Sequence, residues 1–179
     1  MNKRNEIIVL GGGCFWCMEA AFRMLRGVQS VTSGYAGGTA SHPTYEMVCQ
    51  GDTGHAEVVM VMYDAMQITL EEILSVFFTI HDPTMPNRQG NDIGSQYRSI
   101  ILSTEETSRE KVLAFIAHLE KKKIFDHPIV TEVKSLSVFY PAEREHARYF
   151  ERFSEKPYCR VVIAPKIAKL RKKFQKHII

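Results

Sequence analysis

The stretch Gly11-Gly12-Gly13-Cys14-Phe15-Trp16-Cys17-Met18-Glu19 separates a short apolar run, residues 7–10, from apolar residues spaced three and four apart. This pattern predicts a strand, a glycine turn and a helix with Cys14 at its start. Glycines allow positive φ and the close approach of a ligand to the backbone. Free amide groups and the helix dipole favour a thiolate at this position, so we predict a lowered pKa for Cys14.

Cys14 is therefore a candidate nucleophile, and Cys17, one helical turn later, is a candidate partner thiol. Free cysteines are often buried as small hydrophobic residues, and Phe15 and Trp16 have the alternative role of core aromatics. The glycines, the helix start and the C-x-x-C spacing favour a reactive pair over a packed one. The motif by itself indicates redox or nucleophilic cysteine chemistry.

Length and composition are those of a globular protein. The 179 residues suffice for one well-buried core, so we predict a single domain over residues 1–179. No apolar run approaches the roughly 18 residues of a membrane span, and the first residues have no signal-peptide core. Four cysteines do not make a disulfide scaffold. These features predict a cytoplasmic protein with mainly reduced thiols.

The formal charge of +3 is concentrated near the C-terminus, where six lysines and arginines lie between residues 166 and 176, after the last acid, Glu155. A basic tail can bind nucleic acid. However, apolar residues recur at helical spacing between residues 163 and 174. We therefore predict a terminal amphipathic helix with a solvated basic face.

Periodicity, turn residues and capping signals predict the remaining elements. Strands are expected over residues 7–10, 28–35, 58–63, 99–102, 129–133 and 160–163. Helices are expected after capping boxes at residues 69–72 and 103–106, over residues 142–153, and in the tail. Residues 37–52 and 82–96 are expected to be long loops. The βαββαβ order predicts an α+β fold, a two-layer domain with a ferredoxin-like core and C-terminal additions after Leu102.

Polar residues cluster at positions 34–46, 49–57 and 88–98, and loops on a rigid sheet often carry function. The second cluster places Glu57 at the start of an apolar strand. Desolvation there raises the pKa of a carboxyl, which suits a general acid. Each cluster taken alone is also compatible with ordinary turn chemistry.

Together these motifs resemble the A type of peptide methionine sulfoxide reductase. The matching stretches are residues 13–16, 34–38, 43–45, 51–57, 81–83, 89–92, 96–98 and 139–143, with His146. The resemblance extends from about residue 7 to residue 174, nearly the whole chain.

The resemblance implies a peptide-methionine (S)-S-oxide reductase acting on free or protein-bound methionine S-oxide. Cys14 would attack the sulfoxide sulfur, and Glu57 would deliver a proton towards its oxygen. Tyr45 and Tyr97 would hydrogen-bond that oxygen, and Asp92 would support the site. Donors in a dry site can neutralise charge that develops on oxygen.

Phe15 and Trp16 would enclose the methyl group of the substrate. The attack would leave a sulfenic acid on Cys14, which a second thiol would convert to a disulfide. A thioredoxin-like protein would then reduce that disulfide, and no metal or organic cofactor would be needed. We expect a monomer that binds neither nucleic acid nor membranes.

The resemblance leaves the resolving thiol open, because Cys17 stands where glycine is usual in the family. Cys17 is close to Cys14 by spacing, and we favour it over Cys159, which requires the chain to fold back. Cys49 lies at a position not usually credited with catalysis.

Two other classes of protein compete with this interpretation. A thioredoxin-type thiol–disulfide oxidoreductase also places C-x-x-C after a strand, but it does not account for Glu57, residues 90–92 or the tyrosines. A zinc-binding interaction module would use the four cysteines. The chain has a single C-x-x-C pair and no paired histidines after it, which argues against zinc.

Overall fold

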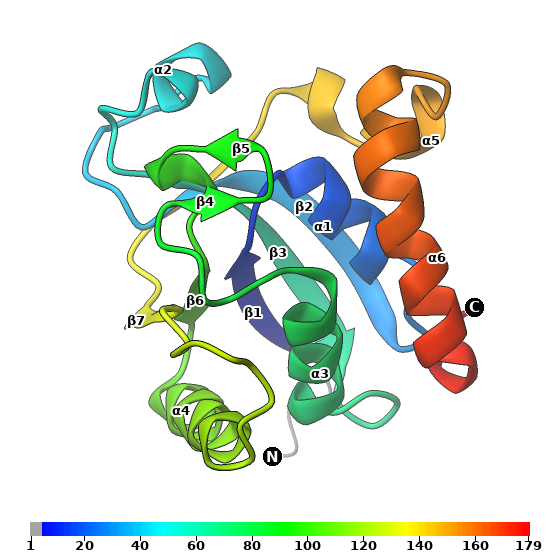
Figure 1. The fold of residues 1–179 in the computed structure, drawn as a ribbon. Coiled ribbons are helices and arrows are strands. Elements are labelled where there is room, and N and C mark those ends of the chain that lie inside the picture. The colour runs from blue at the N-terminus through cyan, green and yellow to red at the C-terminus, as the bar shows by residue number, and fades with distance from the viewer. Residues whose placement is uncertain (1–4) are drawn as a thin grey trace.

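The computed structural model describes residues 5–179, and its centre is a six-stranded sheet with helices packed in front of it (Figure 1). The strand order is β7-β6-β1-β3-β2-β8. The strands are β1 (Asn5–Gly11), β2 (Val28–Ala36), β3 (Ala56–Asp64), β6 (Ile100–Ser103), β7 (Glu132–Ser135) and β8 (Phe139–Pro141). Neighbouring strands are antiparallel except β6 and β7, which are parallel. A separate ribbon pairs β4 (Arg88–Gln89) with β5 (Asp92–Ile93).

The α-helices are α1 (Phe15–Phe22), α2 (Tyr45–Gln50), α3 (Leu70–Ile80), α4 (Glu106–Lys121), α5 (Tyr149–Arg152) and α6 (Ala164–Lys173). Short 3₁₀ turns cover Ser95–Tyr97, Arg144–His146 and Gln175–His177, and a π-helical turn covers Cys159–Ile163. Within residues 5–179, no helix combines the length and apolar character that crossing a membrane requires.

The α+β prediction is confirmed. The strands of the predicted core lie in the order β6-β1-β3-β2 with antiparallel neighbours, which is compatible with a ferredoxin-like arrangement. The segments after β6 extend the sheet at both edges, because β7 pairs with β6 and β8 pairs with β2.

Apolar residues lie on both faces of the sheet because successive side chains of a strand point to opposite sides. In β1, Ile8 and Leu10 join the cluster that includes Phe22 of α1 and Phe77 of α3. Val9 belongs to a smaller cluster. The larger cluster therefore fixes α1 and α3 against the sheet by burial of apolar surface.

The glycine turn after β1 brings the start of α1 against β3. A Cβ atom on Gly11 would lie 2.8 Å from the backbone oxygen of Glu57. Gly13 adopts φ +92°, which L side chains rarely adopt. This turn therefore requires glycine for close backbone approach and for its left-handed conformation.

The predicted strands over residues 7–10, 28–35, 58–63 and 99–102 are confirmed, as are the first helix and the tail helix. The strand predicted over residues 129–133 lies slightly later, as β7. The two predicted long loops contain short elements, α2 in the first and the β4–β5 ribbon in the second.

Three predictions after β6 are wrong. No side-chain capping bond precedes α4, whose N-cap is Glu105. Residues 160–163 form no strand, because Cys159, Ile163 and Ile167 are buried at a spacing of four and continue into α6.

The helix predicted over residues 142–153 is interrupted by Arg148, which has φ 53°. The backbone N–H of Arg148 donates to both oxygens of the buried Glu19 carboxyl, at 3.0 and 2.9 Å. This tertiary bond takes the place of helix continuation, so α5 spans four residues.

The predicted capping box of α3 is present and can be tested. The Thr69 hydroxyl accepts the Glu72 N–H at 3.2 Å, and Glu72 Oε2 accepts the Thr69 N–H at 2.8 Å. We expect Thr69→Ala to lower the free energy of unfolding by about 1 kcal/mol, measured by urea denaturation. Thr69→Ser keeps the hydroxyl and should lose much less. Equal losses in the two variants would show that the methyl group, and not the cap, stabilises α3.

Candidate active site

Cys14 is the N-cap residue of α1, and it is buried, with 6% of its surface exposed. Its carbonyl oxygen accepts the N–H of Cys17 at 3.1 Å, so the first helical turn begins at this residue. The preceding glycine turn is fixed by a bond from the N–H of Gly13 to the carbonyl oxygen of Tyr97, at 3.1 Å. Two distant segments therefore determine where the Cys14 thiol lies.

Glu57 is the second residue of β3 and is 1% exposed. Its Oε2 accepts the backbone N–H of Phe15 at 3.0 Å, which places the carboxyl at the same helix N-terminus as Cys14. Burial raises the pKa of Glu57 to about 8, although the bond from Phe15 acts in the opposite direction. The prediction that this carboxyl resists ionisation is confirmed, and it is mostly protonated at neutral pH.

The two thiols of the C-x-x-C motif differ in acidity. Burial raises the pKa of Cys14, and its hydrogen bond with Cys17 and the nearby Glu57 add to this effect. The pKa of Cys17 is lowered, chiefly by that hydrogen bond with Cys14 and further by Lys166. The predicted lowering of the Cys14 pKa is therefore wrong. A helix N-terminus typically contributes about 0.3–1 kcal/mol, which is less than the desolvation cost of a fully buried thiolate.

Tyr45 and Tyr97 lie around the same carboxyl. Burial, together with the nearby Glu57, raises the pKa of both phenols, so both remain hydrogen-bond donors. The ring of Tyr45, at the start of α2, stacks on Phe15 with centroids 6.3 Å apart. The structure therefore brings the predicted residues Cys14, Glu57, Tyr45 and Tyr97 together.

Phe15 is fully buried, whereas Trp16 is half-buried. The indole of Trp16 stacks on Tyr149 with centroids 3.7 Å apart and an angle of 4° between the rings. Its Nε1–H donates to His146 Nδ1 at 3.2 Å. His146 accompanies the stretch at residues 139–143 that resembles the family, but the sequence indicated no role for it. No sequence pattern pointed to Tyr149.

Glu143 connects three parts of the site. Its Oε2 accepts the hydroxyl of Tyr35 at 2.9 Å and lies 3.3 Å from His146 Nε2, while its Oε1 accepts the N–H of Tyr45 at 3.0 Å. Glu143 belongs to the matching stretch at residues 139–143, and the sequence indicated no individual role for it. The structure shows that it fixes the first residue of α2 relative to β2.

Asp92 lies on the Cys17 side of the site. Its Oδ2 accepts the hydroxyl of Tyr158 at 2.8 Å, and the same hydroxyl lies 3.9 Å from Cys17 Sγ. Cys159 follows directly and is fully buried, with a pKa raised by burial and by the nearby Cys17. The chain therefore does fold back, and both candidate resolving thiols lie in this region. Cys49, in α2, is exposed, and its thiol is hydrogen-bonded to the Tyr45 hydroxyl.

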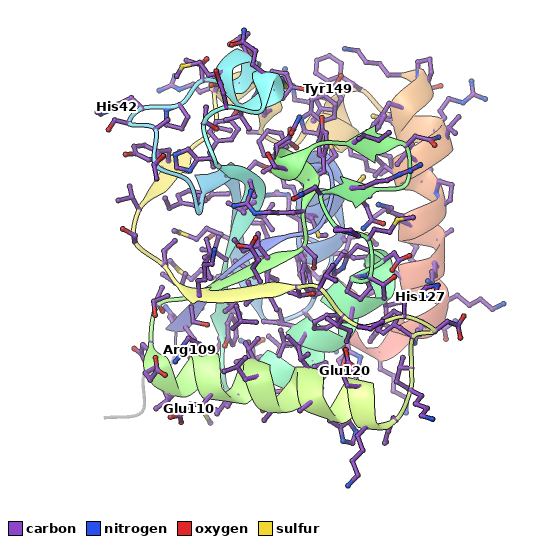
Figure 2. All side chains as sticks on the ribbon, turned by 60° about the vertical axis from the view of Figure 1, so that its left-hand side comes forward. His42, Arg109, Glu110, Glu120, His127 and Tyr149 are labelled. Atoms are coloured by element: carbon purple, nitrogen blue, oxygen red, sulfur yellow. The ribbon has the colours of Figure 1, made fainter. Side chains whose placement is uncertain are left out.

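The site lies at the end of the molecule that contains α2 and Tyr149, opposite α4 with Arg109 and Glu120 (Figure 2). Among residues 5–179, no group of three or more His, Cys, Asp and Glu side chains is arranged to hold a metal ion.

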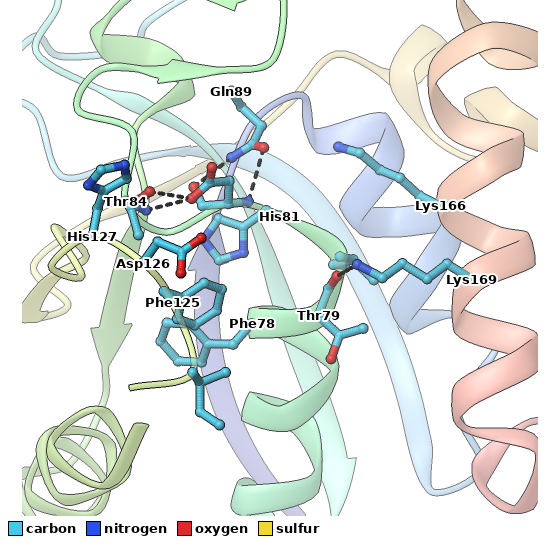
Figure 3. A pocket seen from close by; sticks show the side chains of 13 residues that line it. Phe78, Thr79, His81, Thr84, Gln89, Phe125, Asp126, His127, Lys166 and Lys169 are labelled. Carbon is cyan, nitrogen blue, oxygen red and sulfur yellow. Dashed lines mark hydrogen bonds between the residues drawn. The ribbon is translucent and has the colours of Figure 1, made fainter. Parts of the chain in front are cut away.

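A separate surface pocket of about 480 Å³ lies between α3 and α6 (Figure 3). Its lining includes His81, Asp82, Lys166 and Lys169, but neither Cys14 nor any carboxyl or tyrosine that surrounds it. His81 is bonded through both ring nitrogens, and burial lowers its pKa to about 4. It is therefore a neutral, structural histidine.

A buried thiol pair beside a protonated carboxyl defines a thiol-dependent oxidoreductase site. The family model described as peptide methionine sulfoxide reductase matches residues 6–178. Peptide methionine sulfoxide reductase MsrA of Natronomonas pharaonis is 54% identical over 169 residues, covering 94% of this chain and 95% of the relative. The MsrA of Chromobacterium violaceum is 51% identical over 169 residues, covering 94% and 96%. This chain belongs to the peptide methionine sulfoxide reductase family.

Solved structures agree with this assignment. Methionine sulfoxide reductase A of Corynebacterium diphtheriae superposes with a TM-score of 0.80 at 34% identity, covering 85% of this chain and 76% of that one. Reduced Mxr1 from Saccharomyces cerevisiae has a TM-score of 0.80 at 32% identity, covering 89% and 91%. Mxr1 in complex with Trx2 shares the fold, with a TM-score of 0.57 at 23% identity, covering 83% and 87%.

The raised pKa of Glu57 predicts a pH-dependent stability. Between its unfolded value of 4.5 and about 8, the folded protein holds a proton that the unfolded chain releases. Stability therefore falls as pH rises through this window. Glu57→Gln removes the effect, so the free energy of unfolding of the variant relative to wild type should rise with pH, by at most about 1.4 kcal/mol per unit.

Urea denaturation at pH 5, 6, 7 and 8 measures this difference. The exposed Glu46 of α2 provides the matched control, Glu46→Gln. A Glu57→Gln difference that stayed constant over this range would contradict the raised pKa.

Proposed function

We propose that this protein reduces methionine (S)-S-oxide, free or in proteins, to methionine, with Cys14 as the nucleophile. The observation that carries the proposal is the protonated Glu57 carboxyl at the helix N-terminus that also holds Cys14. A sulfoxide sulfur becomes a better electrophile once its oxygen is protonated, so nucleophile and acid must lie together.

In the first step, Cys14 Sγ bonds to the sulfoxide sulfur while Glu57 gives its proton to the oxygen. Tyr45 and Tyr97 donate hydrogen bonds to this oxygen as charge develops on it. The protonated oxygen then passes from the substrate sulfur to Cys14 Sγ as the substrate S–O bond and the bond between the two sulfurs break, which releases methionine and leaves a sulfenic acid. The Cys14 thiol proton restores Glu57, so the step consumes no proton. The substrate sulfur is reduced by two electrons, and the Cys14 sulfur is oxidised by two.

Trp16 and Phe15 would enclose the methyl group of the substrate. Trp16 suits this role because Tyr149 and His146 hold its indole from two directions, although part of it stays exposed. Phe15 is fully buried, so its ring would contact the methyl group from the protein interior. Both rings exclude water and so strengthen the hydrogen bonds to the oxygen.

Cys17 would resolve the sulfenic acid. It is hydrogen-bonded to Cys14 in the reduced protein, and its pKa is lowered, so Cys17 loses its proton more readily than Cys14 does. The new S–S bond displaces the sulfenic oxygen as water. A dithiol protein of the thioredoxin class would then reduce the disulfide, and the complex of the yeast relative Mxr1 with Trx2 supports this class of reductant.

The nucleophile is tested by Cys14→Ser with methionine (S)-S-oxide as substrate. We expect no measurable methionine release, because a serine hydroxyl is not nucleophilic at neutral pH. Cys49→Ser is the matched control and should retain activity, because the serine hydroxyl can still accept the hydrogen bond of the Tyr45 hydroxyl. Glu57→Gln should slow single-turnover methionine release by about 10²- to 10⁴-fold. If Cys14→Ser kept a substantial fraction of the wild-type rate, another group would have to attack the sulfur.

The resolving thiol is tested by comparing Cys17→Ser with Cys159→Ser. Cys17→Ser should complete one turnover but lose thioredoxin-dependent cycling, and its sulfenic acid should be trapped by dimedone. Cys159→Ser should cycle nearly as wild type. The opposite pair of results would transfer the resolving role to Cys159.

A further inference from the structure

The hydroxyl of Tyr158 lies between the Asp92 carboxyl and the Cys17 thiol. Its hydroxyl donates to Asp92 Oδ2 at 2.8 Å and lies 3.9 Å from Cys17 Sγ, within the longer range of hydrogen bonds to sulfur. Its ring packs edge-on against Trp16 with centroids 5.9 Å apart. These contacts hold the hydroxyl between a thiol and a carboxyl.

The hydrogen bonds in this group have a single consistent direction. A carboxylate only accepts, so the one hydroxyl hydrogen of Tyr158 is directed to Asp92. With its hydrogen directed to Asp92, the Tyr158 oxygen is free to accept a hydrogen bond from the Cys17 thiol, 3.9 Å away. The result is a continuous path of two contacts, from the Cys17 thiol to the Tyr158 hydroxyl and from that hydroxyl to the accepting Asp92 carboxylate.

Cys17 needs such a route because it is 2% exposed and direct access of water to its sulfur is restricted. Asp92, by contrast, is half-buried and, with Tyr158, lines a surface groove of about 660 Å³. A proton that reaches Asp92 can therefore pass to solvent, whereas one on Cys17 has no comparable exit.

We propose that Tyr158 and Asp92 form a proton relay that deprotonates Cys17 as it attacks the Cys14 sulfenic acid. The proposal rests on the assignment of Cys17 as the resolving thiol. Tyr158 Oη takes the Cys17 proton while its own proton moves to Asp92 Oδ2. The S–S bond forms, the S–O bond of the sulfenic acid breaks, and the oxygen leaves as water with a proton from Glu57. Asp92 gains the proton that Cys17 loses, and the leaving oxygen gains the proton that Glu57 loses, so the step is balanced.

Charged and titratable groups surround Cys17 from every adjacent element. Besides Tyr158 and Asp92, they are Cys14 of α1, Glu57 of β3, Cys159 of the π-helical turn and Lys166 of α6. Lys166 stabilises the thiolate by its charge, and the protonated Glu57 is a donor. Of the carboxyls near Cys17, Asp92 is thus the one placed to receive a proton through Tyr158.

The relay is tested by measuring the rate at which the sulfenic acid becomes a disulfide. This rate does not include the earlier reduction of the sulfoxide by Cys14. Enzyme is reacted with one equivalent of methionine (S)-S-oxide without reductant, and dimedone is added at intervals after the methionine burst. Tyr158→Phe keeps the ring against Trp16 but cannot carry a proton. We expect disulfide formation to slow at least about tenfold at pH 7 and to recover by pH 9, because hydroxide then replaces the relay.

Two further variants complete the design. Asp92→Asn can still accept a hydrogen bond but cannot take a proton, so it should show the same recovery at high pH. Tyr63→Phe is the matched control, since the Tyr63 hydroxyl donates to the Glu6 carboxyl at 2.7 Å, away from the site. It should form the disulfide at the wild-type rate.

A wild-type rate and pH profile in Tyr158→Phe would overturn the relay. An equal loss at every pH would also overturn it, because Tyr158 would then hold geometry without moving a proton. Failure of the proposed function would look different, since either the methionine burst would be absent or Cys17→Ser would consume its sulfenic acid normally.

Discussion

The hydrogen bond from the Phe15 N–H to Glu57 Oε2 is the contact on which the site depends. It joins the first turn of α1 to the start of β3, two segments that are 42 residues apart. The bond forms because Gly11 lets the end of β1 lie against the backbone of Glu57. Any side chain at Gly11 would separate the helix N-terminus from the carboxyl, so one steric constraint determines where nucleophile and acid meet.

Burial is the dominant electrostatic effect around this contact. It raises the pKa values of Cys14, Glu57, Tyr45 and Tyr97 together, so the uncharged form of each of these four groups is favoured. A sulfoxide is neutral but strongly polar, and protonated carboxyl and phenol groups can donate to its oxygen without first losing a competing charge. Such preorganised donors in a dry site stabilise a developing oxyanion far more than they would in water. The site therefore favours proton donation over a permanently ionised nucleophile.

The last third of the chain completes the site from outside the sheet. Arg148 is anchored to the buried Glu19 of α1, and this leaves His146 and Tyr149 against Trp16. Further on, Tyr158 reaches Asp92 beside Cys17. Removing this segment would leave α1 with its cysteines but without the groups that orient the indole and connect Cys17 to a base.

Elements with strong local signals could be predicted from the amino-acid sequence: the glycine turn at Cys14, the strand that carries Glu57 and the capped α3. Their periodicity and caps act over a few residues, so they are readable without a fold. Features that depend on groups far apart in the chain could not be predicted in this way, because they arise only from tertiary contacts. Desolvation raised the pKa of Cys14 against the helix dipole. A bond to Glu19 ended the helix predicted over residues 142–153. Tyr158 lies between Cys17 and Asp92, although Tyr158 and Asp92 are 66 residues apart in the chain. No local sequence pattern encodes such a contact.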